Sequence, residues 1–160
     1  MDNLEGVFIT TKKDGCTSYR SSVTYKGKHI SLGSFSTAED AHHAYLEANM
    51  LLRDANPPLL DSHGPHCALP FLKWVVLLNF RDNRMYFPTP IYVRPHFFYY
   101  YYSPEHVLKF DTDDLFYYAS HKIMKRGGHY FVADFGMQVN ILNRKLLRLL
   151  LTFIRLFSQQ

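Results

Sequence analysis

Hydrophobic and polar residues alternate in the first third of the chain along three short segments, residues 6–13, 19–26 and 29–35. Asp14-Gly15 and Gly27 separate these segments with residues that favour tight hairpin turns. Successive side chains of a strand point to opposite faces, so Val23 and Arg20 lie on different faces of the second segment. The pattern predicts a three-stranded antiparallel sheet with one apolar face and one polar, mildly basic face.

The apolar spacing becomes helical directly after the third segment. Apolar residues recur at intervals of three and four and form one stripe, which comprises Ala38, Ala41, Tyr45, Ala48 and Leu52. Ser36 or Thr37 is the expected N-cap, with Glu39 and Asp40 in the first turn, where the helix dipole favours acids. Asn-Pro-Pro at residues 56–58 ends the helix. Residues 1–56 therefore predict a sheet backed by one helix.

The net charge does not by itself indicate nucleic-acid binding. The chain carries 18 basic and 14 acidic residues, a formal charge of +4. Four of the basic residues fall in the last 17 positions, which contain no acid, namely Arg144, Lys145, Arg148 and Arg155. Residues 1–143 thus hold 14 bases and 14 acids. The argument for a nucleic-acid partner depends on where the charges lie.

The cysteine content and the hydropathy indicate a reduced, intracellular protein. The two cysteines, Cys16 and Cys67, lie far apart and do not suggest a disulfide framework. The N-terminal residues are acidic and lack the apolar core of a signal peptide. The longest apolar run, around residues 149–151, is too short and too charged to cross a bilayer, so we expect no transmembrane segment.

Four groups of residues in the first third have a characteristic order and spacing: Gly6-Val7, Tyr19-Arg20-x-x-Val23, Gly27-Lys28-x-Ile30-x-Leu32-Gly33-x-Phe35 and Thr37-Ala38-Glu39-Asp40-Ala41-x-x-Ala44-Tyr45. In these groups, residues 5–55 resemble the DNA-binding domain of the plant ethylene-response-factor (apetala-two type) family, which also occurs in bacterial and phage proteins. The resemblance covers a third of the chain. It implies a sheet that lies in the major groove of DNA and reads bases from its exposed face.

The resemblance also implies which residues contact DNA. The strand positions that carry base-reading side chains in plant members, together with the helix tyrosine, are here Phe8, Thr10, Lys12, Ser22, Thr24, His29, Ser31 and Tyr45. The expected phosphate partners are Arg20, Lys12, Lys13, Lys26 and Lys28. Most arginines that grip guanine are replaced by serine or threonine, which discriminate less between bases. We therefore expect duplex binding with modest or altered sequence preference.

Beyond a linker at residues 57–66, the sequence predicts a second α+β unit over residues 67–143. Residues 70–80 form a dense apolar run that fits either a buried strand or a short core helix. Strands are expected at residues 85–93, 96–102, 130–135 and 137–142. Residues 111–126 predict a helix with an acidic first turn, a basic end and Gly127-Gly128 as its stop.

Residues 144–160 differ from the rest of the chain. On a helix, Lys145, Arg148, Thr152 and Arg155 would form one polar stripe on a leucine-rich surface. Such a helix would close the core of the second unit, form a dimer interface or lie on an anionic membrane surface. A reading frame that shifted late in the gene would produce an equally abrupt change, and the sequence leaves these alternatives open.

Two segments beyond residue 56 contain residue types that bind metals or bases. His63, His66 and Cys67 are metal-ligand types, but a zinc site needs about four ligands and no further pair is evident, so we predict no metal. The aromatic residues 97–102 would either stack on exposed bases or place one face of a strand in the core, and the core interpretation is favoured.

Two further groups lie near the end of the predicted helix. A basic cluster would either contact phosphates or simply complement the helix dipole, and it comprises Lys122, Lys125 and Arg126. His121, His129 and Asn140 suggest a His-Asn-His nuclease. In such nucleases the metal-binding helix follows the hairpin, whereas the predicted helix here precedes it.

The sequence therefore predicts a non-enzymatic, cofactor-free, double-stranded DNA-binding protein, either a transcription regulator or an accessory factor of a mobile element. Its expected location is with DNA inside the cell, in the nucleus of a eukaryote or the cytoplasm and nucleoid of a bacterium. The alternative is a protein-interaction module in which residues 67–160 bind a second copy or another protein. A degenerate nuclease is a third interpretation.

Overall fold

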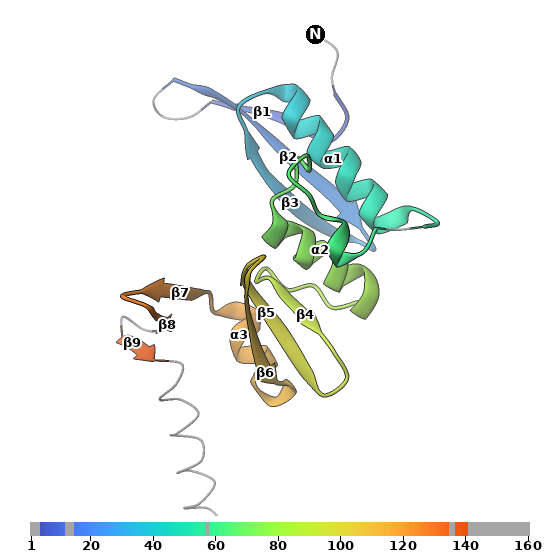
Figure 1. The fold of residues 1–160 in the computed structure, drawn as a ribbon. Coiled ribbons are helices and arrows are strands. Elements are labelled where there is room, and N and C mark those ends of the chain that lie inside the picture. Colours follow the sequence, from blue (N-terminus) through green and yellow to red (C-terminus); the bar gives the residue numbers. More distant parts are fainter. Residues whose placement is uncertain (1–3, 12–14, 57, 135–136, 141–160) are drawn as a thin grey trace, which may run out of the picture. The chain divides into compact units, whose positions relative to one another are not determined.

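The computed structural model describes residues 4–11, 15–56, 58–134 and 137–140 (Figure 1). Helices and strands are mixed along the chain, which confirms the expected α+β class. Contacts between residues divide the chain into two compact units, Met1–Thr112 and Asp113–Gln160.

The first sheet consists of β1 (Val7–Thr11), β2 (Thr17–Tyr25) and β3 (Lys28–Phe35), which pair antiparallel in that order. Helix α1 (Ala38–Arg53) packs on one face of this sheet. Val23 and Ile30 of the sheet and Ala44 of the helix are each at most 2 % exposed. Thr37 caps α1, because its Oγ1 accepts a 3.1 Å hydrogen bond from the Asp40 amide. The three predicted strands and the predicted helix are confirmed to within a few residues.

A β-bulge interrupts the pairing of β2 with β3. Ser22 lies opposite Ser31, whereas Arg20, two residues earlier on β2, lies opposite Ser34, three residues later on β3. Gly33 has φ +149°, a conformation that residues with a side chain rarely adopt. Before the bulge, the odd-numbered residues His29 and Ser31 of β3 lie on the face away from α1. After the bulge, the even-numbered Ser34 lies on that face, which strict alternation along β3 does not predict.

Helix α2 joins α1 to a second sheet. The first unit continues with η1 (Leu60–Ser62), α2 (Phe71–Asn83) and the antiparallel strands β4 (Ile91–Val93), β5 (Phe97–Ser103) and β6 (His106–Asp111). Helix α2 contacts α1, β4 and β5 (Figure 1). Seven successive residues of this helix, from Trp74 to Phe80, are buried. A helix buried on all sides is apolar all round, so the run at residues 70–80 is a core helix rather than a strand. Strand β4 covers only the end of residues 85–93, and β6 has no counterpart among the expected strands.

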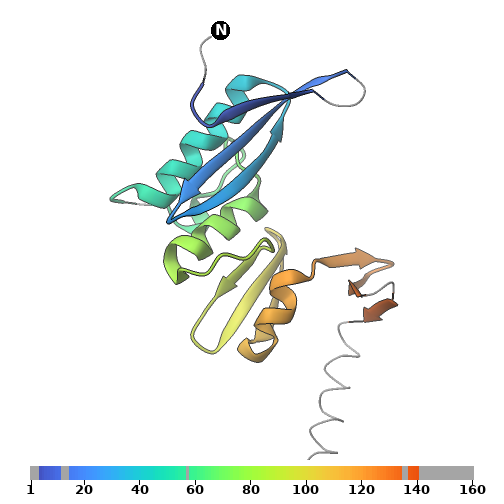
Figure 2. The same cartoon turned by 180° about the vertical axis from the view of Figure 1, so that it is seen from behind.

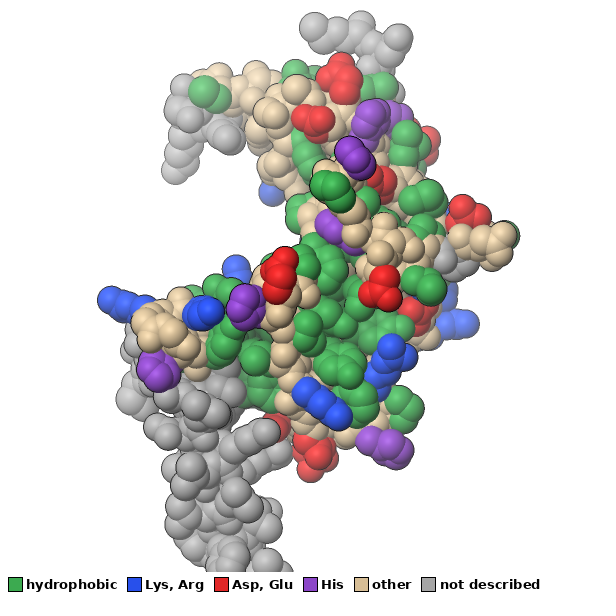
Figure 3. Space-filling model, viewed as in Figure 1, with side chains coloured by type: hydrophobic (Ala, Val, Ile, Leu, Met, Phe, Trp, Pro, Cys, Tyr) green, Lys and Arg blue, Asp and Glu red, His purple; other side chains and the backbone are tan. Residues whose placement is uncertain are grey.

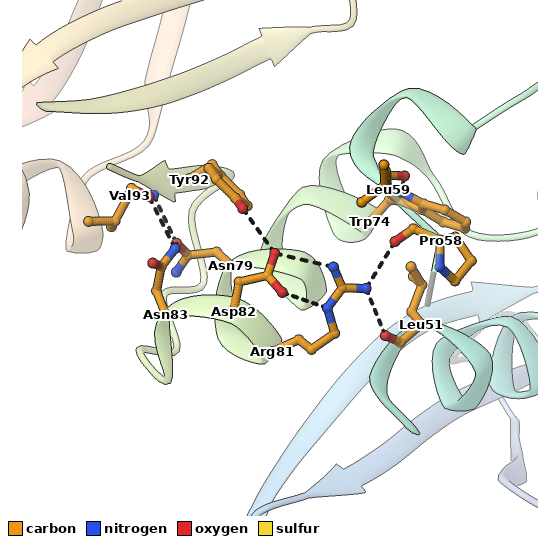
Figure 4. Close-up of polar contacts among 10 residues, drawn as sticks. All are labelled: Leu51, Pro58, Leu59, Trp74, Asn79, Arg81, Asp82, Asn83, Tyr92 and Val93. Atoms are coloured by element: carbon orange, nitrogen blue, oxygen red, sulfur yellow. Dashed lines mark hydrogen bonds and ion pairs between the residues drawn. The ribbon is translucent and has the colours of Figure 1, made fainter. Parts of the chain in front are cut away.

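Residues 57–66 do not separate two independent cores. The Arg81 guanidinium of α2 donates hydrogen bonds to the carbonyl oxygens of Leu51, at 3.1 Å, and Pro58, at 2.9 Å (Figure 4). The Trp74 indole donates to the Leu59 carbonyl at 3.3 Å. Buried side chains of the first sheet, α1 and α2 form a single hydrophobic cluster. The boundaries expected at residues 56 and 67 therefore differ from the structure, in which α2 completes the core that α1 begins.

The described residues of the second unit form a short helix and a third sheet. After η2 (Thr112–Asp114) the chain forms α3 (Leu115–Ser120), β7 (Ile123–Arg126), β8 (His129–Asp134) and β9 (Met137–Asn140). The helix expected over residues 111–126 is wrong beyond Ser120, because residues 123–126 pair with β8 as a strand. Ile123 is 1 % exposed and lies opposite Val132 in this pairing. Gly127-Gly128 is thus a hairpin turn and not a helix stop. Residues 144–160 lie outside the described residues.

Candidate nucleic-acid interface

The face of the first sheet opposite α1, here called the outer face, is open among the described residues (Figure 2). A shallow hollow of about 440 Å³ lies on this face, and its lining comprises Phe8, Thr10, Arg20, Ser21, Ser22, His29 and Ser31. Six of these seven residues are ones that the sequence predicts as DNA contacts. The structure therefore gathers half of the twelve predicted site residues around one concave surface.

Cross-strand pairing determines which outer-face side chains are neighbours. The rows that run across the strands are Phe8–Arg20–Ser34, Ser22–Ser31 and Thr24–His29. His29 Nδ1 lies 3.4 Å from Thr24 Oγ1 in the third row. Ser34, which is exposed beside Arg20, is absent from the sequence prediction because alternation alone places it on the inner face. The isolated glycine within the strand, Gly33, is the signal that points to a bulge.

Positive and negative side chains lie on different parts of this domain. The described residues between positions 6 and 36 include no acid, and their basic residues are Arg20, Lys26 and Lys28. Acidic and histidine side chains lie over α1 on the opposite side (Figure 3). The Arg20 guanidinium is exposed and makes no hydrogen bond or ion pair with another described residue. Its five N–H donors are therefore available to a ligand.

Lys28, at the turn between β2 and β3, is oriented by the segment that follows α2. Its Nζ lies 5.0 Å from the centroid of the Tyr86 ring. Tyr86 packs edge-to-face on Phe80 of α2 at 5.7 Å, and Phe80 packs in the same way on Tyr25 of β2 at 5.5 Å. Burial raises the pKa of the Tyr86 phenol. Sequence reasoning misses Tyr86, because a contact over nearly sixty residues has no local signal.

Tyr45 lies away from the hollow. Its hydroxyl donates a 2.7 Å hydrogen bond to Oε1 of Glu5, and this bond raises the pKa of Tyr45. Its ring packs so closely on Gly6 that a Cβ atom added there would come within 2.2 Å of it. Gly6 has φ +76°, which also favours glycine. Tyr45 thus fixes the start of β1 against α1.

The remaining predicted contacts fall into two groups. Lys26 lies at the hairpin turn beside Lys28, with its Nζ 5.0 Å from the centroid of the Tyr25 ring. Lys12 and Lys13 lie outside the described residues. Lys28 lies opposite Tyr25, whose ring packs on Phe80 of α2, so the Lys28 side chain belongs to the inner side of the sheet at this turn. Among the described basic residues, Arg20 is the one that lines the hollow on the outer face.

Two of the candidate metal-ligand residues, His63 and Cys67, make local structural contacts. His63 Nε2 hydrogen-bonds to the Leu69 carbonyl at 2.9 Å, and the Cys67 sulfur accepts from the Gly64 amide at 3.4 Å. Within the described ranges, no three His, Cys, Asp or Glu side chains are grouped so as to hold a metal ion.

The aromatic run of β5 supplies core residues. Phe98 and Tyr100 are at most 2 % exposed, and Tyr101 packs on Phe71 of α2 at 5.7 Å. In the second unit, His121 stacks on Tyr117 at 4.3 Å and hydrogen-bonds to its carbonyl.

Comparisons with protein-family models, with curated proteins and with solved structures found no match to this chain. Among the described residues, no helix combines the length and the apolar character needed to cross a membrane. The outer face of the first sheet remains the surface with the strongest chemical argument for a ligand.

Proposed function

We propose that this protein binds double-stranded DNA by laying the outer face of β1–β3 in the major groove. The observation that carries the proposal is the hollow, whose lining includes an unpaired arginine among hydroxyl and imidazole side chains. The major groove is about 12 Å wide and admits strands as well as helices. The role is a non-enzymatic one, in transcription regulation or as an accessory factor of a mobile element, in association with DNA inside the cell.

The division of labour within the interface follows from side-chain chemistry. Arg20 offers paired donors that match the two major-groove acceptors of guanine or a phosphate. Lys26 and Lys28 at the turn suit phosphates, and Lys12 and Lys13 are assigned to phosphates from the sequence. Base edges would meet the hydroxyl and imidazole groups of Thr10, Ser22, Thr24, His29, Ser31 and Ser34. These groups discriminate weakly, so non-specific affinity should form a large part of the total.

The test is fluorescence anisotropy with a labelled random-sequence duplex at low salt. The wild type should bind, and its affinity should fall steeply as salt rises, because neutralised phosphates release counterions. The double variant Arg20→Ala/Lys28→Ala should lose roughly thirtyfold or more in affinity, because it removes two cationic contacts at about 1 kcal/mol or more each.

A charge-matched control separates site binding from general attraction. Arg94→Ala/Lys109→Ala removes the same two residue types from the β4–β5 turn and from β6, where both side chains are exposed. This control should bind like the wild type apart from a small change in salt dependence. Equal affinities for the two double variants would refute DNA binding by the outer face.

A further inference from the structure

Phe8 is exposed on the outer face, where a large aromatic side chain has no role in the core. It is 56 % exposed, lines the hollow and lies directly opposite Arg20 across the β1–β2 pairing. Its neighbour Ile9 is 66 % exposed but belongs to the other side of the strand and does not line the hollow. The Phe8 ring and the Arg20 guanidinium thus place an apolar group and a hydrogen-bond donor side by side on the outer face.

The major groove contains one apolar feature, the methyl group at C5 of a pyrimidine. Thymine carries it, and so does 5-methylcytosine, whereas uracil and cytosine lack it. Phenylalanine contacts this methyl group, and arginine binds the N7 and O6 acceptors of guanine with paired donors. Side chains directly opposite each other on antiparallel strands have Cβ atoms about 5 Å apart. Neighbouring bases on one strand are about 3.4 Å apart, so Phe8 and Arg20 can reach two adjacent bases.

We propose that Phe8 and Arg20 together recognise a 5-methylated pyrimidine next to a guanine. The inference rests on the proposed function and deepens it by naming a base step. Phe8 removes the methyl group from water while Arg20 satisfies the guanine acceptors. Thr10, whose side chain also lines the hollow, adds a second methyl-bearing contact on the same strand. The serines that line the hollow can hydrogen-bond to any base, so Phe8 and Arg20 provide the discrimination between bases.

The experiment measures the affinity of the full-length protein for alternating 16-base-pair duplexes that differ by one group. The first pair is d(TG)·d(CA) against d(UG)·d(CA), and the second is d(CG) with and without 5-methylcytosine. Removing the methyl group should weaken binding about fourfold for each base step that the protein contacts, because one buried methyl group returns to water. If the protein binds the methylated duplex more tightly in both pairs, it recognises the methyl group itself. If it does so in the first pair alone, it recognises thymine.

Variants assign the effect to the pair. Phe8→Ala should bind methylated and unmethylated duplexes equally, Phe8→Leu should keep part of the difference, and the matched control Ile9→Ala should keep all of it. Arg20→Lys should keep the methyl preference and lose the preference for d(TG) over d(TA). Thermal unfolding of each variant verifies that it is folded, as expected for exposed positions.

The outcomes separate the two proposals. One outcome would overturn methyl recognition and leave DNA binding intact. In that outcome the protein binds methylated and unmethylated duplexes equally, its binding depends on salt, and Arg20→Ala/Lys28→Ala weakens that binding. An equal loss of the methyl preference in Phe8→Ala and Ile9→Ala would also overturn methyl recognition. Absence of binding to every duplex would overturn both.

Discussion

The first sheet, β1–β3, buries one face and leaves the other open, whereas the second sheet, β4–β6, engages side chains on both faces. On the second sheet, Phe98, Tyr100 and Phe110 are at most 6 % exposed on one face. On the other face, Tyr101 packs on Phe71, and Lys109 lies 3.9 Å from the centroid of the Phe97 ring. Hydrophobic side chains gather over these strands (Figure 3). The side chains of the second sheet already have partners within the chain, so we interpret its faces as structural. The outer face of the first sheet carries the unpaired Arg20 and is available to a ligand.

Helix α2 nevertheless links the two sheets, because it packs on α1 and also on β4 and β5. Helix α2 contributes Trp74, Leu77 and Leu78 to the same cluster as Ile30 and Leu51 of the first sheet and α1. The Glu47 carboxylate of α1 accepts hydrogen bonds from the Ala68 and Leu69 amides at 2.8 and 2.9 Å. The segment that resembles a known DNA-binding domain thus depends on residues that follow it.

The largest effect should come from separating the two sheets. A fragment of residues 1–56 lacks α2 and exposes Leu51 and Leu52, which are 0 and 4 % exposed in the chain. A domain of about 60 residues is marginal even with an intact core. We expect this fragment to show no cooperative thermal transition by circular dichroism, whereas residues 1–112 should melt cooperatively. A cooperative transition of the short fragment at the same midpoint would show that the first sheet and α1 suffice.

The next effect should come from the buried amide that joins α2 to the second sheet. Asn79 is 1 % exposed, and its Oδ1 accepts from the Val93 amide at 2.9 Å (Figure 4). Its Nδ2 donates to the Met85 carbonyl at 2.8 Å. Asn79→Ala leaves these groups unpaired, and we expect a loss of about 3 kcal/mol in the free energy of unfolding by urea.

Asn56→Ala, at an exposed position, is the matched control and should change stability by less than about 0.5 kcal/mol. DNA affinity of folded Asn79→Ala should equal that of the wild type, because the second sheet does not contact the ligand. A loss of affinity at full folding would mean that both sheets contribute to the interface.

The sequence predicts the first sheet well because its pattern is local. Alternation places Val23 and Arg20 on opposite faces, and the alanine stripe fixes the packing side of α1. Ser34 escapes prediction because a bulge changes the parity of β3, although Gly33 marks the place. Strand register follows directly from that alternation, so six of the candidate residues line the same hollow. They are Phe8, Thr10, Arg20, Ser22, His29 and Ser31.

The second half is predicted less well because its elements depend on distant partners. The apolar run at residues 70–80 has no period that separates a helix from a strand, and burial on several sides decides it. Residues 123–126 have helix-ending chemistry, yet pairing with β8 makes them a strand. Gly127-Gly128 suits both outcomes, so local propensity cannot distinguish them.

The smallest effect should come from the aromatic contact between Tyr86, which follows α2, and Lys28 at the β2–β3 turn. Tyr86 orients Lys28 at 5.0 Å, so Tyr86→Leu should free the ammonium group while it retains most of the buried volume. We expect DNA affinity to fall about two- to fivefold, corresponding to about 0.5–1 kcal/mol for an exposed cation–π contact. Tyr86→Phe keeps the ring and should bind like the wild type in the same anisotropy measurement. Unchanged affinity of Tyr86→Leu would mean that Lys28 reaches phosphate without this support, and that the second half contributes stability alone.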